Sequence, residues 1–412
     1  MTQRSNRACL LAIAIVGYTA ISSALPAQTA TREADDVRQL RLAAEAGDAR
    51  AQFDLGVRYA GGKGVAANDA EAARWIGLAA AQGLADAQFN LGLMYADGNG
   101  VGVDPQQAVF WLRKAADQGD ARAQSNLGLM YANGSGVSRD AAQAAQWYRK
   151  AADQGEITAQ FTLGLMYASG DGTAKDPQQA AAWFLRAAER GHAAAQFNIG
   201  VHYTRGIGVP QDVVRAAEWF QKAAAQDEAG AQLALGTMYL SGNGVPRDLT
   251  QGLRWIRASA EQGNADAQYR LALMFANGIA TARDDGQAVV WYQKAAAGGV
   301  AAAQTNLGAR YATGVGVPQD TVLALQWFRK AADQGDGSAQ FNLGVMYANG
   351  SGTTVDVVEA YKWLTLAVGA ASGDEQKRYG TARDTLARSM TPDQLLLAQR
   401  RVQEWRPAGV RQ

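Results

Sequence analysis

A repeat of 36 residues, present nine times without an insertion, is the feature that most limits how this chain can fold. An Ala-Gln pair marks each copy, with its glutamine at Gln52, Gln88, Gln124, Gln160, Gln196, Gln232, Gln268, Gln304 and Gln340. A tryptophan recurs at the same interval, at Trp75, Trp111, Trp147, Trp183, Trp219, Trp255, Trp291, Trp327 and Trp363. One such unit is too small to bury its own apolar residues, so neighbouring units must share an elongated core. The sequence therefore predicts a solenoid over residues 48–371.

Each repeat is expected to form two helices joined by a turn. In the second copy, Ala87, Leu91 and Tyr95 share one face of a helix over 85–97, which should end at Gly98. Asp104, followed by proline, then has the pattern of an N-cap that starts a second helix. A glutamine or glutamate stands three residues after this cap in most copies, which predicts a capping-box arrangement. The predicted fold is all-α, a solenoid of nine helix-turn-helix repeats.

The two ends of the array should be closed by different helices. Residues 28–47 are expected to form an N-terminal capping helix, because 35–47 match a second helix whose tryptophan position holds the polar Gln39. After Ala371 the 36-residue period is lost, and residues 372–412 predict two longer capping helices, one of which starts at Thr391. The seventh repeat has Phe275 for the tyrosine and Ala280 for a turn glycine, so we expect a local change of packing near 264–299.

The first 27 residues have the composition of a secretory signal peptide. Arg4 and Arg7 precede an apolar stretch over 8–25, and small residues follow it. We expect cleavage after Ala27 or after Ala24; the alternative is an uncleaved membrane anchor. Cys9 is the only cysteine, so the mature chain would contain no disulfide bond and, once the signal is removed, would not be stably inserted in a membrane.

The repeat itself is similar to a known family. The pattern Ala-Gln-x-x-Leu-Gly-x-x-Tyr-x-x-Gly-x-Gly-Val, followed by Asp-x-x-x-Ala-x-x-Trp-x-x-x-Ala-Ala-x-x-Gly, resembles the Sel1-like repeat, a relative of the tetratricopeptide repeat. This resemblance implies a right-handed superhelix of α-hairpins that acts as an adaptor or regulatory scaffold for a protein or peptide partner. For an exported bacterial member it implies a periplasmic or secreted protein in cell-envelope regulation or host contact. We expect it to be a monomer.

Charge and motif content argue against the other functional classes. The formal net charge is +1, which gives no electrostatic footprint for nucleic acid and argues against a reader of one RNA base per repeat. The only histidines, His192 and His202, belong to no HExxH motif, cysteine cluster or carboxylate group, so no metal, cofactor or catalytic residue is predicted. The rival enzyme hypothesis is the β-lactam binding or hydrolysis suggested for cysteine-rich relatives, whose cysteines this chain lacks.

One row of polar residues is the candidate for partner binding. The position two residues after each marker glutamine points away from the expected core face of the first helix. It holds Asn90, Asn126, Asn198, Asn306 and Asn342, and one helical turn further on stand Arg58, His202 and Arg310. An asparagine amide offers a donor and an acceptor to a peptide backbone. The alternative is a solvated polar face without a partner, whereas the tryptophans are assigned to the core and the glycine pairs to turns.

Overall fold

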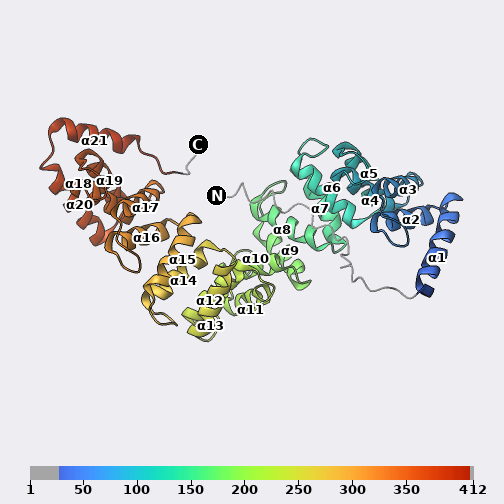
Figure 1. Ribbon diagram of the computed structural model, residues 1–412, viewed down its shortest axis with the longest axis horizontal. Helices are drawn as coiled ribbons and strands as arrows, with labels where there is room; N and C mark the ends of the chain where they lie inside the picture. Colours follow the sequence, from blue (N-terminus) through green and yellow to red (C-terminus); the bar gives the residue numbers. More distant parts are fainter. Residues whose placement is uncertain (1–26, 409–412) are drawn as a thin grey trace. The chain divides into compact units, whose positions relative to one another are not determined.

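A computed structural model describes residues 27–408, and in that range the protein consists of helices and connecting turns without a strand (Figure 1). The predicted all-α solenoid of paired helices is therefore confirmed. The signal-peptide prediction falls, except for residue 27, outside the described residues.

Every repeat contributes a first helix and a second helix, and nearly all of them are 13 residues long. The first helices are α2 (Ala49–Gly61), α4 (Ala85–Asp97), α6 (Ala121–Asn133), α8 (Ile157–Ser169), α10 (Ala193–Arg205), α12 (Ala229–Ser241), α14 (Ala265–Asn277), α16 (Ala301–Thr313) and α18 (Gly337–Asn349). The second helices are α3 (Asp69–Ala81), α5 (Pro105–Asp117), α7 (Ala141–Asp153), α9 (Pro177–Glu189), α11 (Val213–Ala224), α13 (Leu249–Glu261), α15 (Asp285–Ala297), α17 (Thr321–Asp333) and α19 (Val357–Ala370).

The chain divides into two compact units, an N-terminal unit that ends at Trp219 and a C-terminal unit that begins at Phe220. Within each unit a second helix packs against its own first helix and against the first helix of the next repeat, as α3 does with α2 and α4. The core between these helices combines alanines with larger apolar side chains, as Ala87 packs in one cluster with Leu91. Gly56 illustrates the close approach, because a Cβ atom there would lie 2.6 Å from Cγ1 of Ile76.

The turn inside each repeat depends on left-handed backbone positions. Gly98 ends α4 with φ +81°, and Gly100 follows with φ +71°, where a Cβ atom would overlap the carbonyl oxygen of Asp69. The seventh repeat keeps this conformation with an alanine, since Ala280 has φ 60°. Helix α14 nevertheless has the same length as its counterparts and ends at a left-handed glycine, Gly278. The expected change in this repeat therefore affects side chains and one strained residue and leaves the helix lengths unchanged.

The second helices start as predicted, with one difference. The Asp104 carboxylate accepts hydrogen bonds from the backbone N–H groups of Gln106 and Gln107, at 3.0 Å each. The backbone N–H of Asp104 itself donates to the carbonyl oxygen of Tyr95 at 2.8 Å, so no reciprocal bond from a glutamine side chain is needed. Among the described residues, the full capping box forms only at the start of α21, between Thr391 and Gln394.

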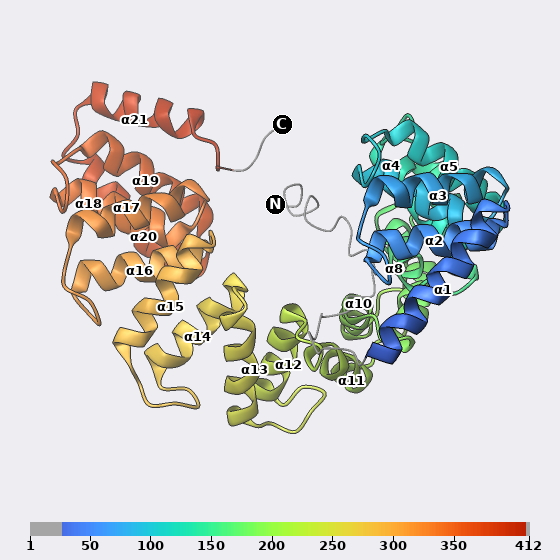
Figure 2. The ribbon, with the colours of Figure 1, turned by 45° about the vertical axis from the view of Figure 1, so that its right-hand side comes forward.

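Helices outside the repeats cover both ends of the array. Helix α1 (Ala27–Glu45) packs on α2 and buries Val37 and Ala44. At the other end, α20 (Gly373–Ala387) and α21 (Pro392–Glu404) pack on α19, and Figure 2 shows α21 lying along the last repeats. Trp405 meets the buried Trp363 edge to face, with ring centroids 6.2 Å apart.

Candidate functional site

The asparagines of the predicted binding row lie on first helices and are partly buried. In α4, α6 and α10 the amide nitrogen donates to a carbonyl oxygen one turn earlier in the same helix, from Asn90 to Asp86 at 2.8 Å and from Asn198 to Ala194 at 2.7 Å. Asn126 makes the same bond to Arg122 at 2.9 Å. These bonds fix the orientation of the amides. Each amide keeps its oxygen and its second N–H for a partner.

The remaining two asparagines behave differently. Asn306 donates to the Tyr269 hydroxyl at 3.3 Å and so connects α16 to the preceding first helix, α14. Asn342 has no hydrogen-bond partner within residues 27–408. Asn90, Asn126 and Asn198 belong to the N-terminal unit, and Asn306 and Asn342 belong to the C-terminal unit. The predicted row is therefore two rows, one in each unit.

Three basic side chains were predicted beside the asparagines, and two of them make other contacts. His202 is only 7% exposed, and its Nδ1 atom lies 2.7 Å from the carbonyl oxygen of Ile207. Arg310 pairs with Asp285, the first residue of α15, at 2.5 Å. This position holds a buried methionine in other repeats, such as Met94, because it packs toward the turn and the start of the preceding second helix. Only Arg58, which is partly buried, has no side-chain hydrogen bond or ion pair among the described residues.

The marker glutamines form a buried hydrogen-bond network that connects successive repeats. Gln52 Nε2 donates to the Ala44 carbonyl oxygen at 3.1 Å, and Gln82 Nε2 donates to Gln52 Oε1 at 2.8 Å. The same pair forms between residues 30 apart in four further repeats, namely Gln88 with Gln118, Gln124 with Gln154, Gln232 with Gln262, and Gln304 with Gln334. The second glutamine at this fixed spacing is visible in the sequence and was the signal for a structural role.

Three repeats replace the second glutamine, one of them with Gly298, and the other two leave a buried oxygen without a partner. Arg190 stands at the partner position of Gln160, and Ala370 stands at the partner position of Gln340. In both repeats the buried Oε1 atom of the marker glutamine has no hydrogen-bond partner in the described part of the chain. Since a buried polar atom without a partner costs free energy, we expect these two junctions to be weaker than those with the complete pair.

The repeated tryptophans differ in burial: some are buried in the core and others are partly exposed. Trp75, Trp183, Trp291 and Trp363 are buried, as predicted, whereas Trp111, Trp147, Trp255 and Trp327 are only partly buried. A basic side chain three residues later covers many of the rings, as Lys150 covers Trp147 at 3.9 Å and Lys330 covers Trp327 at 4.1 Å. The ladder therefore contributes to the core and also forms a cation-covered stripe on the second helices.

Both histidines have structural contacts. His192 is the N-cap of α10, and its Nδ1 atom accepts a hydrogen bond from the backbone N–H of Ala195 at 3.1 Å. Burial lowers the pKa of both imidazoles, partly offset for His192 by the nearby Glu156 carboxylate. Within residues 27–408 there is no group of three or more histidine, cysteine or acidic side chains suited to a metal ion. In the same range, no helix combines the length and apolar character needed to cross a membrane.

Comparison with known proteins places this geometry in a family. The Sel1 repeat model matches nine consecutive segments, 49–84, 85–120, 121–156, 157–192, 193–228, 229–264, 265–300, 301–336 and 337–369. The chain is similar to the solved structure of c5321, a protective antigen present in uropathogenic Escherichia coli strains, with 33% identity over 90% of this chain and 94% of that one and a TM-score of 0.59. It is also similar to a Sel1 repeat protein from Oxalobacter formigenes, with 37% identity over 75% and 89% of the two chains and a TM-score of 0.60. No curated protein matches the sequence.

Proposed function

The chain belongs to the Sel1 repeat family, and from that premise we propose that it is an exported scaffold that binds a protein or peptide partner along its first helices. Proteins of this family generally act as protein–protein interaction scaffolds and are typically not enzymes. The proposal adds the location, the binding surface and the monomeric state of the scaffold.

The oriented asparagines of the N-terminal unit carry the proposal. Asn90, Asn126 and Asn198 repeat the same intrahelical hydrogen bond, so their free amide groups have a fixed orientation before a partner binds. A prearranged donor and acceptor lowers the entropy cost of binding an extended peptide backbone. Thr162 interrupts the row in the fourth repeat and supplies a natural control position.

Two observations support export. Arg4, Arg7 and the apolar stretch that follows have the pattern of a signal peptide, and the array itself contains no cysteine. The similar Escherichia coli protein is described as a protective antigen, which favours a place where host proteins can reach it. We propose a periplasmic or secreted location in the bacterial envelope. Intact-mass measurement of the native protein should give a chain that begins near residue 25 or 28.

The binding surface is tested by replacing its amides. The protein is immobilised, partners are captured from envelope extracts and identified by mass spectrometry, and the affinity of the purified partner is measured. Replacing Asn90, Asn126 and Asn198 by alanine should weaken binding by about 1.5–4.5 kcal/mol, roughly ten- to a thousandfold, because up to three hydrogen bonds are lost.

A matched variant separates this effect from a general surface change. Thr162→Ala alters the same helix position without removing an amide and should leave the affinity unchanged. Circular dichroism melts should nearly coincide for all variants, since each asparagine amide bonds only within its own helix and alanine is the better helix former. An unchanged affinity of the triple variant would move the binding surface away from the first helices.

A further inference from the structure

Two neighbouring positions on the exposed face of α13 have contacts that differ from those at the corresponding positions of other second helices. Two residues after the tryptophan stands Arg257, and three residues after it stands Ala258, where several other repeats have lysine or arginine. Both positions have a defined contact elsewhere in the protein. Comparing both positions in α13 with those contacts therefore shows which groups are left without their usual partner.

The first difference frees a guanidinium group. At the position of Arg257, the arginines Arg113, Arg149 and Arg329 each donate a hydrogen bond to a tyrosine hydroxyl of the next first helix. In front of Arg257 the next first helix has Phe275, whose ring centroid lies 5.9 Å from the guanidinium carbon. Phenylalanine offers no hydroxyl, so Arg257 keeps its hydrogen-bond donors for another group.

The second difference opens a hollow. Lys150 lies 3.9 Å and Lys294 lies 4.0 Å from the ring centre of the tryptophan three residues earlier. Ala258 is too short to cover Trp255 in this way, and this partly buried ring has Arg254 as its cationic neighbour instead, 5.2 Å from the ring centre. An open hollow of about 410 Å³ lies over this face, lined by Thr250, Leu253, Arg254, Arg257, Ala258 and Glu261.

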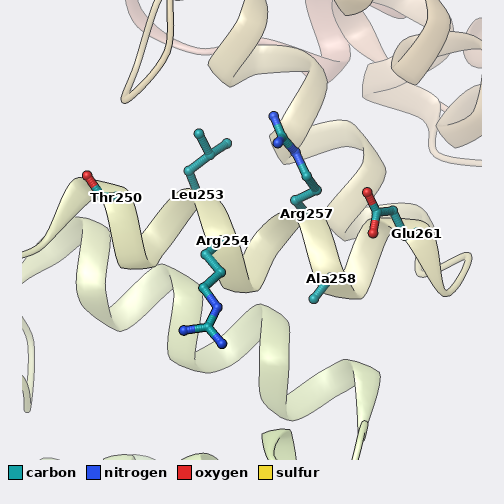
Figure 3. A pocket seen from close by; sticks show the side chains of 6 residues that line it. All are labelled: Thr250, Leu253, Arg254, Arg257, Ala258 and Glu261. Atoms are coloured by element: carbon teal, nitrogen blue, oxygen red, sulfur yellow. The ribbon is translucent and has the colours of Figure 1, made fainter.

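The charge around the hollow is unbalanced. Figure 3 shows Arg254 and Arg257 extending to opposite sides of α13, with Leu253 beside them and Glu261 at the far end. Neither arginine forms an ion pair with any described residue, and Arg254 contacts only the Trp255 ring, at 5.2 Å. Two exposed guanidinium groups attract carboxylates, while Glu261 disfavours a further acid at the end of the helix.

We propose that this face of α13 binds an acidic segment of a partner protein. An apolar side chain of the segment would fill the hollow against Leu253 and Ala258, and flanking carboxylates would pair with Arg254 and Arg257. The surface lies on a second helix of the C-terminal unit and involves none of the asparagines. It therefore adds a second contact surface to the proposed scaffold, with its own partner chemistry.

Binding of labelled synthetic peptides tests the proposal. Each of three peptides of about 12 residues carries two glutamates that flank a leucine, with a spacing of two residues in the first peptide, three in the second and four in the third. The affinity of each peptide for the full chain is measured by fluorescence anisotropy. At least one should bind, and Arg257→Ala should weaken that peptide about ten- to a hundredfold, because a charge-assisted hydrogen bond is lost. Arg329→Ala removes the same charge from a helix whose arginine is engaged by Tyr347, and should leave the affinity unchanged.

Two further variants keep both arginines. Phe275→Tyr returns a hydroxyl acceptor to Arg257, and Ala258→Lys covers the hollow with the side chain found in other repeats. Both should weaken peptide binding severalfold, although the first leaves the charge unchanged and the second makes it more positive. Equal losses in Arg257→Ala and Arg329→Ala, tighter binding by Ala258→Lys, or no binding of any of the three peptides would each overturn the proposal.

Discussion

The junction from α7 to α8 in the N-terminal unit and the junction from α13 to α14 in the C-terminal unit share one architecture and differ in their side chains. In the first, Arg149 donates to the Tyr167 hydroxyl and Lys150 covers Trp147. In the second, Phe275 offers no hydroxyl and Ala258 does not cover the tryptophan.

These side-chain differences leave the length and the end of the first helix unchanged. Helices α8 and α14 both have 13 residues and end at a left-handed glycine. Stacking is maintained by small buried residues such as Ala159 and Ala267, neither of which is exposed. The repeat therefore separates stacking from surface chemistry, so single exposed substitutions can create a distinct surface without disturbing the array.

The largest expected effect contrasts a buried with a partly exposed tryptophan. Trp183 is 3% exposed, and Trp183→Ala should lower the free energy of unfolding by about 3–5 kcal/mol, because it removes a large core side chain. Trp255→Ala should cost less than about 3 kcal/mol, since part of that ring already faces water. Urea unfolding measures both changes. A larger loss in Trp255→Ala would contradict the assignment of the two rings.

A smaller difference is expected between the two arginines. Arg149→Ala removes the hydrogen bond to Tyr167 and should destabilise the N-terminal unit by about 0.5–1.5 kcal/mol. Arg257→Ala removes no such bond and should change stability by less than about 0.5 kcal/mol. Tyr167→Phe converts the first junction to the side-chain pattern of the second and should reproduce the loss of Arg149→Ala. The double variant should lose no more than either single variant.

The last residue of a first helix supplies the third test. The buried Oδ2 atom of Asp97, at the end of α4, has no partner among the described residues, and burial raises the pKa of this carboxyl. In α14 the equivalent Asn277 donates to the Leu273 carbonyl oxygen at 3.0 Å. Asp97→Asn should therefore stabilise the N-terminal unit by about 0.5–1.5 kcal/mol at neutral pH.

The pH dependence of this gain has a defined sign. Because the carboxyl pKa is raised by folding, the cost of ionising Asp97 appears as the pH rises through the folded-state pKa. Below the ordinary value of 3.8 the acid is protonated in both states and can donate like an amide. Melts of wild type and variant should then coincide, and a gain that persists in acid would exclude ionisation as its cause.

The most selective effect should be the response to mild acid. Both histidines lie in the N-terminal unit, and burial lowers their pKa values from 6.5. Stability is complete above about pH 6.5 and is lost as the pH falls through the lowered folded-state values, because only the unfolded chain then binds the protons. Hydrogen exchange, taken relative to the intrinsic rate of an unprotected amide at each pH, should therefore accelerate in α9 and α10 as the pH falls below about 6.5, with no change in α17 and α18.

A substitution identifies the group responsible. His192→Asp restores the cap residue that Asp120 and Asp336 provide in other repeats, and His202→Met restores the buried methionine. The double variant should lose the acceleration. Equal acceleration of the two units in wild type would show that carboxylates, rather than these imidazoles, dominate the response.

Much of this architecture could be predicted from the sequence because the 36-residue period repeats the same local signals. The end of α4 at Gly98 and the start of α5 after Asp104 follow from backbone rules that act within a few residues. The candidate site was less predictable. His202 was assigned to the polar row although the same position holds methionine in other repeats, and that methionine was the sequence signal for its burial against the turn. By contrast, the freedom of Arg257 depends on Phe275 in the next helix, a contact between residues 18 apart in the sequence.

The glutamine network has a consequence for how such a chain can grow. Each marker glutamine donates to a carbonyl oxygen eight residues back, and in five repeats it accepts a hydrogen bond from a glutamine 30 residues ahead, so both bonds are set by fixed offsets within the period. Unequal recombination between equivalent codons of repeats that carry both glutamines would regenerate both bonds on either side of the crossover. Whole repeats can therefore be gained or lost without a new kind of contact. A change of one residue in the repeat length would leave buried amides without their hydrogen-bond partners. The length of the array is free to evolve, while the length of its unit is not.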